Sequence, residues 1–170
     1  SLFKPPKQQY KSNLICNDSM SKSFLLVGGS SDIARHLAAM LLDDGHAVTL
    51  LARDAERVEE LVTQGAELVV GDALDEATVQ SAVAHASQQG EAGLSGMAHL
   101  VGSIALRPPH ATKLDDFEAV LQTNLISAFI ALKTSGKAML KLGTGRMVFT
   151  SSVAASYGLT NHEAISAAKG

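Results

Sequence analysis

The sequence has few cysteines and few aromatic residues. Among 170 residues there is no tryptophan, 4% are aromatic, and the only cysteine is Cys16. A single cysteine cannot form an internal disulfide, and a lack of disulfides is typical of reducing compartments. We therefore expect an aliphatic core and a cytoplasmic location.

Other absences narrow the class of protein. No apolar run is long enough to span a bilayer, and the first residues lack the apolar core of a signal peptide. The net charge of -3 gives no basic excess for binding nucleic acid or an anionic membrane. The histidines show no metal-ligand spacing, so no metal site is expected. The 46% hydrophobic and 18% charged residues that are present indicate a soluble globular domain.

The first 23 residues differ from the rest of the chain. They combine Pro5-Pro6 with lysines and amide side chains and show no hydrophobic periodicity. We predict a disordered tail or leader over 1–23, with Met20 as a candidate natural start, and a single domain over 24–170.

From Phe24 onward, apolar runs alternate with amphipathic stretches. The apolar runs predict strands at 24–27, 47–51, 67–70, 97–101 and 146–150. The amphipathic stretches predict helices at 31–44, 55–64, 75–88, 114–142 (with a break near Ser135-Gly136) and from Asn161 onward. This alternation predicts a Rossmann-type α/β fold, a doubly wound parallel sheet in three layers. Such sheets usually have a further strand, so we expect the domain to be truncated at its C-terminal end.

A glycine-rich turn joins the first predicted strand to the first helix. Gly28 and Gly29 allow close approach of the backbone, and Ser30 and Ser31 add hydroxyl donors. Free backbone N–H groups and the helix dipole favour an anion at this position. The turn therefore predicts binding of a nucleotide pyrophosphate.

The end of the second strand bears on which nucleotide is bound. An acid there usually accepts from the ribose 2′-hydroxyl of NAD, but this chain has Ala52 followed by Arg53. A guanidinium suits a 2′-phosphate, which favours NADP(H) over NAD(H). Two alternatives stay open: Arg53 is a solvated charge paired with Asp54 or Glu56, or Asp54 bonds a ribose hydroxyl of NAD(H).

These motifs and their order resemble the short-chain dehydrogenase/reductase family, from Phe24 to Gly170. Gly28 matches the first glycine of that family's Gly-x-x-x-Gly-x-Gly turn, with Asp32 and Ala34 at the other two glycine positions. The Asp32 carboxylate repels a pyrophosphate unless it caps the helix instead. The resemblance implies cofactor contacts at Gly28, Ser30, Ser31, Asp32 and Ile33.

Two further cofactor segments carry the resemblance. Asp72 and Ala73 after the third strand match the pair that meets the adenine edge, while Asp72 as a simple strand terminator stays open. Of the family's Asn-Asn-Ala-Gly after the fourth strand, only Gly102 remains. Because His99 and Leu100 replace the asparagines, we expect the polar links that steady the central sheet to be lost.

The resemblance also implies a catalytic set for a carbonyl or alcohol substrate. Ser152 matches the serine that holds the substrate oxygen, Asn124 the relay asparagine, and Lys169 the lysine that binds the nicotinamide ribose. The family's tyrosine, whose pKa such a lysine lowers, is replaced by Ile165. Ser152 as a loop serine, Asn124 as a structural residue and Lys169 as an exposed lysine remain alternatives.

Three residues are candidates for the proton donor that replaces the tyrosine. His162 lies seven positions before Lys169, within roughly 20° of its helical face, and imidazole titrates near neutrality. Tyr157 lies in the predicted loop before that helix, and Glu163 faces elsewhere. His162 is the preferred surrogate.

Two functions are open at this point. One is an oxidoreductase with an altered proton donor, and the other is an inactive NAD(P)-binding sensor or partner subunit. Because the family commonly pairs subunits through the helices at 114–142 and after Asn161, a homo-oligomer is expected.

Overall fold

The computed structural model describes residues 21–170, so the predictions on Cys16 and Met20 lie outside the described residues. Its centre is a parallel five-stranded sheet in the order β3-β2-β1-β4-β5. The strands are β1 (Ser23–Val27), β2 (Ala47–Ala52), β3 (Glu67–Val70), β4 (Leu94–His99) and β5 (Arg146–Phe149). The predicted parallel sheet is confirmed.

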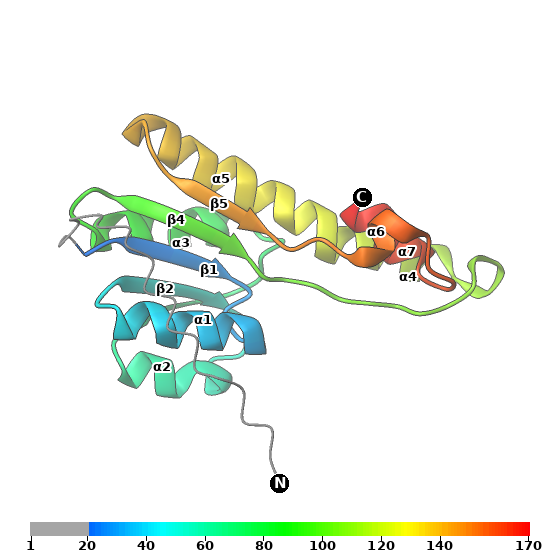
Figure 1. Ribbon diagram of the computed structural model, residues 1–170, viewed down its shortest axis with the longest axis horizontal. Coiled ribbons are helices and arrows are strands. Elements are labelled where there is room, and N and C mark those ends of the chain that lie inside the picture. The colour runs from blue at the N-terminus through cyan, green and yellow to red at the C-terminus, as the bar shows by residue number, and fades with distance from the viewer. Residues whose placement is uncertain (1–20) are drawn as a thin grey trace, which may run out of the picture.

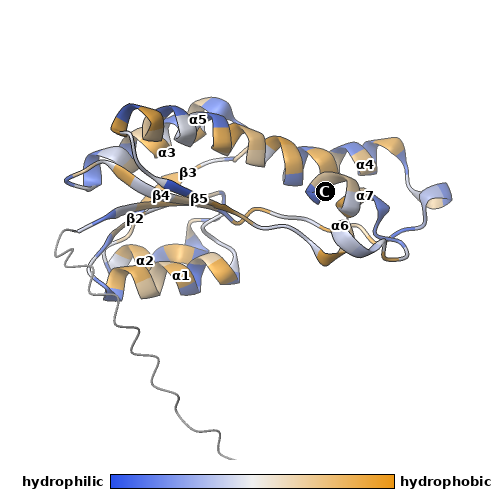
Figure 2. Cartoon of the chain, turned by 45° about the horizontal axis from the view of Figure 1, so that its top comes forward, coloured by the Kyte–Doolittle hydropathy of each residue, from blue (hydrophilic) through white to orange (hydrophobic). Residues whose placement is uncertain are grey.

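Helices cover both faces of this sheet (Figures 1 and 2). On one face lie α1 (Asp32–Asp43) and α2 (Glu59–Thr63), the latter entered through a 3₁₀ turn, Glu56–Val58. On the other face lie α3 (Glu76–Gln89) and α5 (Ser127–Leu142). Right-handed crossovers that go first to one side and then to the other produce this doubly wound, three-layer arrangement.

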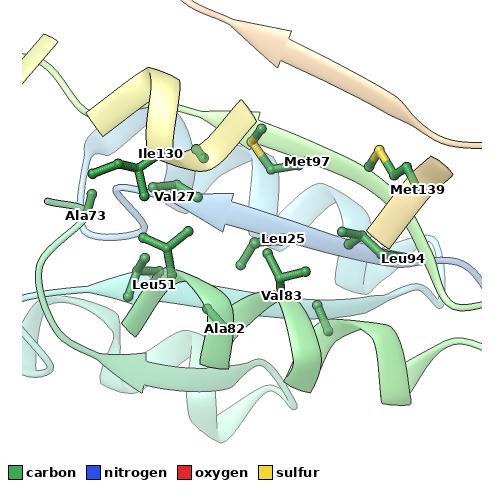
Figure 3. Close-up of a cluster of buried hydrophobic side chains, with 13 residues drawn as sticks. Leu25, Val27, Leu51, Ala73, Ala82, Val83, Leu94, Met97, Ile130 and Met139 are labelled. Carbon is green, nitrogen blue, oxygen red and sulfur yellow. The ribbon is translucent and has the colours of Figure 1, made fainter. Parts of the chain in front are cut away.

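Strand β1 supplies core residues to both faces, as a central parallel strand must. Leu25 and Val27 pack with Leu51 against α3 and α5, and Figure 3 shows this cluster. Leu26 points the other way and packs with Ala38 of α1. Both clusters are aliphatic apart from methionine, in agreement with the scarcity of aromatic residues.

Three short helices gather beyond the C-terminal ends of the strands (Figure 1). They are α4 (Leu114–Leu121), α6 (Val153–Tyr157) and α7 (Glu163–Lys169), and they enclose a third apolar cluster. The sequence prediction treated the α6 segment as loop, which was wrong. Ser152 begins α6, with its Oγ accepting from the Ala154 N–H at 3.2 Å.

The predicted helix at 114–142 is interrupted at a different place from the one expected. A π-helical segment, Gln122–Ile126, separates α4 from α5, whereas the helix passes unbroken through Ser135 and Gly136. Ser135 is buried against the sheet, so tertiary packing outweighs the low helix propensity of the Ser-Gly pair.

Strand β4 also begins earlier than predicted, at Leu94 rather than Met97, and ends at His99. Ser95 and Gly96 have low strand propensity, but Gly96 fits closely against β1. A Cβ at Gly96 would lie 2.7 Å from Cδ1 of Phe24. The Phe24 ring occupies the space that a side chain at position 96 would need, which is the reason for glycine inside this strand.

No helix among residues 21–170 combines the length and the apolar character needed to cross a membrane.

Removal of a core side chain tests the central position of β1. Leu25 has no exposed surface, so Leu25→Ala is expected to lower the free energy of unfolding by about 3 kcal/mol in urea denaturation. Met40, 65% exposed on α1, is the control, and Met40→Ala should change stability by less than about 0.5 kcal/mol. Equal effects of the two substitutions would contradict the assigned core.

Candidate cofactor and catalytic site

A cleft of about 210 Å³ opens at the C-terminal ends of β1, β2 and β4. It contains many of the residues predicted to bind a cofactor: Gly28, Ser30, Ser31, Arg53, Asp72, Ala73 and Gly102. It is completed by residues to which the prediction assigned no cofactor contact: Leu51, Ala52, Arg57, Gly71, Leu74, Leu100, Val101, Thr123 and Ser127. Sites in open parallel sheets form at this edge, where the crossovers diverge.

The turn after β1 is held tightly against its neighbours. The amides of Gly28 and Gly29 both donate to the Leu51 carbonyl, at 3.0 and 2.9 Å. Gly28 has φ of +88°, and a Cβ there would lie 2.8 Å from the Val101 nitrogen. Only glycine meets both conditions, so the turn requires Gly28 for its conformation and for its contact with the β4 side of the cleft.

The start of α1 keeps donors available for an anion. Ser31 is the N-cap and accepts from the Ala34 N–H at 3.2 Å, so the interpretation of Asp32 as the cap was wrong. Within residues 21–170, the amides of Ser30, Asp32 and Ile33 donate to no protein acceptor. The Ile33 side chain is 66% exposed and does not line the cleft. These free N–H groups at a helix N-terminus fit a phosphate group.

Two arginines, Arg53 and Arg57, line the cleft, each beside a carboxylate from another element. Arg53 Nη1 lies 3.8 Å from Asp72 Oδ2, which corrects the alternative that paired it with Asp54 or Glu56. Arg57 Nη2 lies 3.2 Å from Asp32 Oδ1. The sequence prediction assigned the Arg57 segment to a charged amphipathic helix at 55–64 and gave Arg57 no role in the cleft.

A second cavity of about 300 Å³ lies beside Lys169. It is lined by Asn124, Leu125, Ala128, Phe129, Leu132, Phe149, Thr150, Ser151, Ala168, Lys169 and Gly170. Lys169 Nζ donates to the Thr150 carbonyl at 2.9 Å and approaches the Val101 carbonyl at 3.5 Å. Burial lowers the pKa of Lys169. The ammonium thus bridges the C-terminal ends of β4 and β5.

Asn124 lies in the π-helical segment and is 1% exposed. Its Nδ2 donates to the Ser103 carbonyl at 3.0 Å and to the Val120 carbonyl at 2.9 Å, while its Oδ1 accepts from the Ser103 N–H at 3.2 Å. The side chain therefore clamps the loop that follows Gly102. A Cβ at Gly102 would lie 3.4 Å from that same Oδ1.

His99 corrects the expectation that the polar links of the central sheet are lost. It is 1% exposed, and its Nε2 lies 2.9 Å from the Ser127 hydroxyl, which itself donates to the Thr123 carbonyl at 2.5 Å. Nε2–H is then the donor to Ser127. Desolvation first, and then the charge of Lys169, lower the pKa of His99 to about 4. A neutral imidazole thus joins β4 to the start of α5.

Comparison with known proteins agrees with this geometry. Residues 22–170 match the family model for short chain dehydrogenase. The chain belongs to the short-chain dehydrogenase family.

Relatives of known name support the assignment. The chain is 29% identical over 157 residues to the 3-oxoacyl-[acyl-carrier-protein] reductase MabA of Mycobacterium tuberculosis, covering 88% of this chain and 58% of that protein. It is 30% identical over 155 residues to D-threitol dehydrogenase of Mycolicibacterium smegmatis, covering 87% and 59%. The chain thus spans less than two thirds of the length of these relatives.

Solved structures share the fold. Levodione reductase superposes with a TM-score of 0.80 at 25% identity, covering 87% of this chain and 60% of that one. A short-chain type dehydrogenase/reductase from Mycobacterium ulcerans gives a TM-score of 0.81 at 24% identity, covering 88% and 58%.

The remaining predicted residues of this short-chain dehydrogenase lie around α6 and α7. Ser152 is half-buried at the start of α6, and it is the neighbouring Ser151 that lines the cavity beside Lys169. Ile165 is 4% exposed, packed with Val120 and Ala154 in the third apolar cluster. The Ile165 position is therefore an apolar, closed one.

Two of the candidate proton donors differ from expectation in their local structure. His162 immediately precedes the first helical residue of α7, so the helical spacing used to place it does not extend to it. Its Nδ1 lies 2.7 Å from the Thr160 carbonyl. Tyr157 is the last residue of α6 rather than a loop residue, and its side chain is 78% exposed.

The buried His99 predicts a pH dependence of stability. An unfolded histidine titrates near 6.5, so between about pH 4 and 6.5 the unfolded state binds a proton that the folded state does not. The contribution of His99 therefore makes stability rise with pH across that window, by on the order of 3 kcal/mol, and stay flat above it. The measurement is the free energy of unfolding against pH for the parent and His99→Gln.

The difference between parent and His99→Gln should change across pH 4 to 6.5 and be constant above it. His110→Gln is the matched control, because His110 is exposed in the 3₁₀ turn Pro109–Ala111 before α4. A difference that does not vary with pH would mean that His99 is not a buried neutral residue.

Proposed function

We propose that this chain is an NAD(P)-dependent oxidoreductase that uses NADP(H), with NAD(H) possible, to interconvert a carbonyl and an alcohol on a small molecule. The observation that carries the proposal is the cleft, which brings together a glycine-rich turn with unpaired backbone amides and two guanidinium groups. The names of the relatives, a reductase of a 3-oxoacyl group and a dehydrogenase of a sugar alcohol, support this substrate class.

The chain's own residues have separable roles in binding. The amides of Ser30, Asp32 and Ile33 bind the pyrophosphate, with Gly28 allowing its approach. Arg53 binds a 2′-phosphate, and Asp72 with Ala73 meets the adenine edge. Gly102 would face the nicotinamide end of the cofactor, and Lys169 would bind the nicotinamide ribose. The bound cofactor supplies or accepts the hydride.

Proton transfer falls to residues other than a tyrosine, because Ile165 stands at the family's tyrosine position. A carbonyl oxygen only accepts, so the 2.7 Å contact of His162 with Thr160 makes Nδ1–H the donor and leaves Nε2 free to exchange a proton. Ser152 orients the substrate oxygen, and Asn124 holds the Ser103 loop beside the cavity. His162 is the proton donor in this proposal.

A second function is favoured by the closed Ile165 position. Ile165 packs in an apolar cluster, and Lys169 is engaged with the Thr150 and Val101 carbonyls. A chain with this arrangement binds NADP(H) without turnover and acts as a sensor or partner subunit. Exposed apolar residues on and near α5, Leu125, Phe129 and Leu132, support a homo-oligomer in either case.

Cofactor titration tests the shared part of both functions. The full chain is titrated with NADPH and with NADH, followed by the fluorescence of the reduced nicotinamide. We expect NADPH to bind with at least about tenfold lower Kd, because Arg53 adds a charge-assisted contact to the 2′-phosphate. Failure to bind either nucleotide overturns the proposed function.

Turnover on a panel of carbonyl compounds separates the two functions. In the active form, His162→Ala should lower kcat by about 10²-fold because it removes the general acid, while leaving the NADPH Kd unchanged. His110→Ala is the control and should leave kcat as in the parent. Binding of NADPH with no hydride transfer on any compound would establish the inactive function instead.

The Ile165→Tyr substitution tests how much of the catalytic set is retained. Gain of activity in this variant would show that Ser152, Asn124 and Lys169 are competent. The larger side chain enters a closed cluster, so a loss of stability of about 1–3 kcal/mol is expected alongside. Thermal unfolding of the same sample measures that loss, and no activity in a folded Ile165→Tyr protein would contradict a retained set.

A further inference from the structure

Arg57 has the features of a residue that determines cofactor specificity. It belongs to none of the motifs described in the sequence analysis. It lies in the 3₁₀ turn after β2 and lines the cleft along with Arg53. Asp54 Oδ1 accepts from the Arg57 N–H at 3.4 Å, which ties this turn back to the end of β2. Both arginines of this segment therefore reach the same cleft.

Asp32 gives Arg57 its position. Asp32 Oδ1 lies 3.2 Å from Arg57 Nη2 and 3.7 Å from Arg35 Nη1, so one carboxylate oxygen is shared by two guanidinium groups. The ion pair joins the first turn of α1 to the turn after β2, two segments that are 25 residues apart. Asp32 thereby directs a cation to the mouth of the cleft.

This pairing also accounts for an acid beside an anion-binding turn. An isolated carboxylate near a phosphate is repulsive, but one flanked by two guanidinium groups adds no net negative charge to the site. Arg53 is arranged in the same way, with Asp72 at 3.8 Å. Each cleft arginine thus has a carboxylate partner from a different element.

We propose that Arg57, positioned by Asp32, is a second specificity-determining residue, and that it binds the 2′-phosphate of NADP(H) together with Arg53. The inference rests on the proposed function, because it concerns how the cleft selects NADP(H) over NAD(H). A phosphate monoester suits this arrangement because two planar guanidinium forks provide parallel N–H donors. Asp32 is a positioning residue and does not itself touch the phosphate.

The test uses fragments that lack nicotinamide, so that binding is read without hydride transfer. Isothermal titration calorimetry is carried out on the full chain with adenosine 2′,5′-bisphosphate and with 5′-AMP. The ratio of the two Kd values isolates the contribution of the 2′-phosphate. Arg57→Ala should weaken binding of the bisphosphate about tenfold and leave binding of 5′-AMP unchanged.

Arg35→Ala is the matched control, because Arg35 shares the Asp32 carboxylate but does not line the cleft. It should leave the ratio as in the parent. An Arg57→Ala protein with the parental ratio, and with a parental circular dichroism spectrum, overturns the role of Arg57.

The positioning role of Asp32 is tested by repeating Arg57→Ala in an Asp32→Ala background. Without its carboxylate partner, the guanidinium loses its orientation, so Arg57→Ala should there weaken bisphosphate binding by less than about threefold. An equal loss in both backgrounds refutes the positioning role. If the parent binds the bisphosphate and 5′-AMP equally, the inference on specificity is wrong. Binding of NADH by the same protein would still agree with the proposed oxidoreductase.

Discussion

The parallel pairing of β1 with β2 on one side and β4 on the other determines where the site lies. Val27, the last residue of β1, is in register with Leu51 and with His99, so three strands end at the same level. The bonds continue past the strands, since the Gly28 and Gly29 amides donate to Leu51 and the Leu100 amide donates to Val27. The walls of the cleft are thus an extension of the sheet's own hydrogen bonding, and the chain reverses its winding direction at this point.

A set of buried polar contacts then fixes the elements around the sheet's C-terminal edge. The contacts are the hydrogen bonds of His99 with Ser127, of Asn124 with Ser103, and of Lys169 with Thr150. Each of these groups would be costly to bury without a partner, so each contact constrains two elements at once. His99 therefore provides a polar link from the central sheet to the start of α5. The Lys169 ammonium already contacts the backbone carbonyls of Thr150 and Val101. To bind a ribose hydroxyl, it would have to keep these contacts or exchange one of them.

The sequence predicted the sheet and part of the cleft lining, because those features depend on local pattern. Apolar runs and Gly28 carry their structural meaning within a few residues. Arg57 and its partner Asp32 were not predicted as a pair, because their contact joins segments that only the β1–β2 pairing brings together. The π-helical segment was missed for the same reason, since the Asn124 contact with Ser103 stabilises it from outside the helix. The short helix α6 was missed because five residues give too little periodicity to detect.

Both proposed functions require the cleft at the end of β1 to bind the dinucleotide. Hydrogen–deuterium exchange of the full chain with and without NADPH tests it directly, because the amides of Ser30, Asp32 and Ile33 have no protein acceptor to protect them. We predict slowed exchange at 28–33, 53–57, 71–74 and 100–102 on adding NADPH. Unchanged exchange at 28–33, with protection confined to segments away from the cleft, would contradict dinucleotide binding at this position.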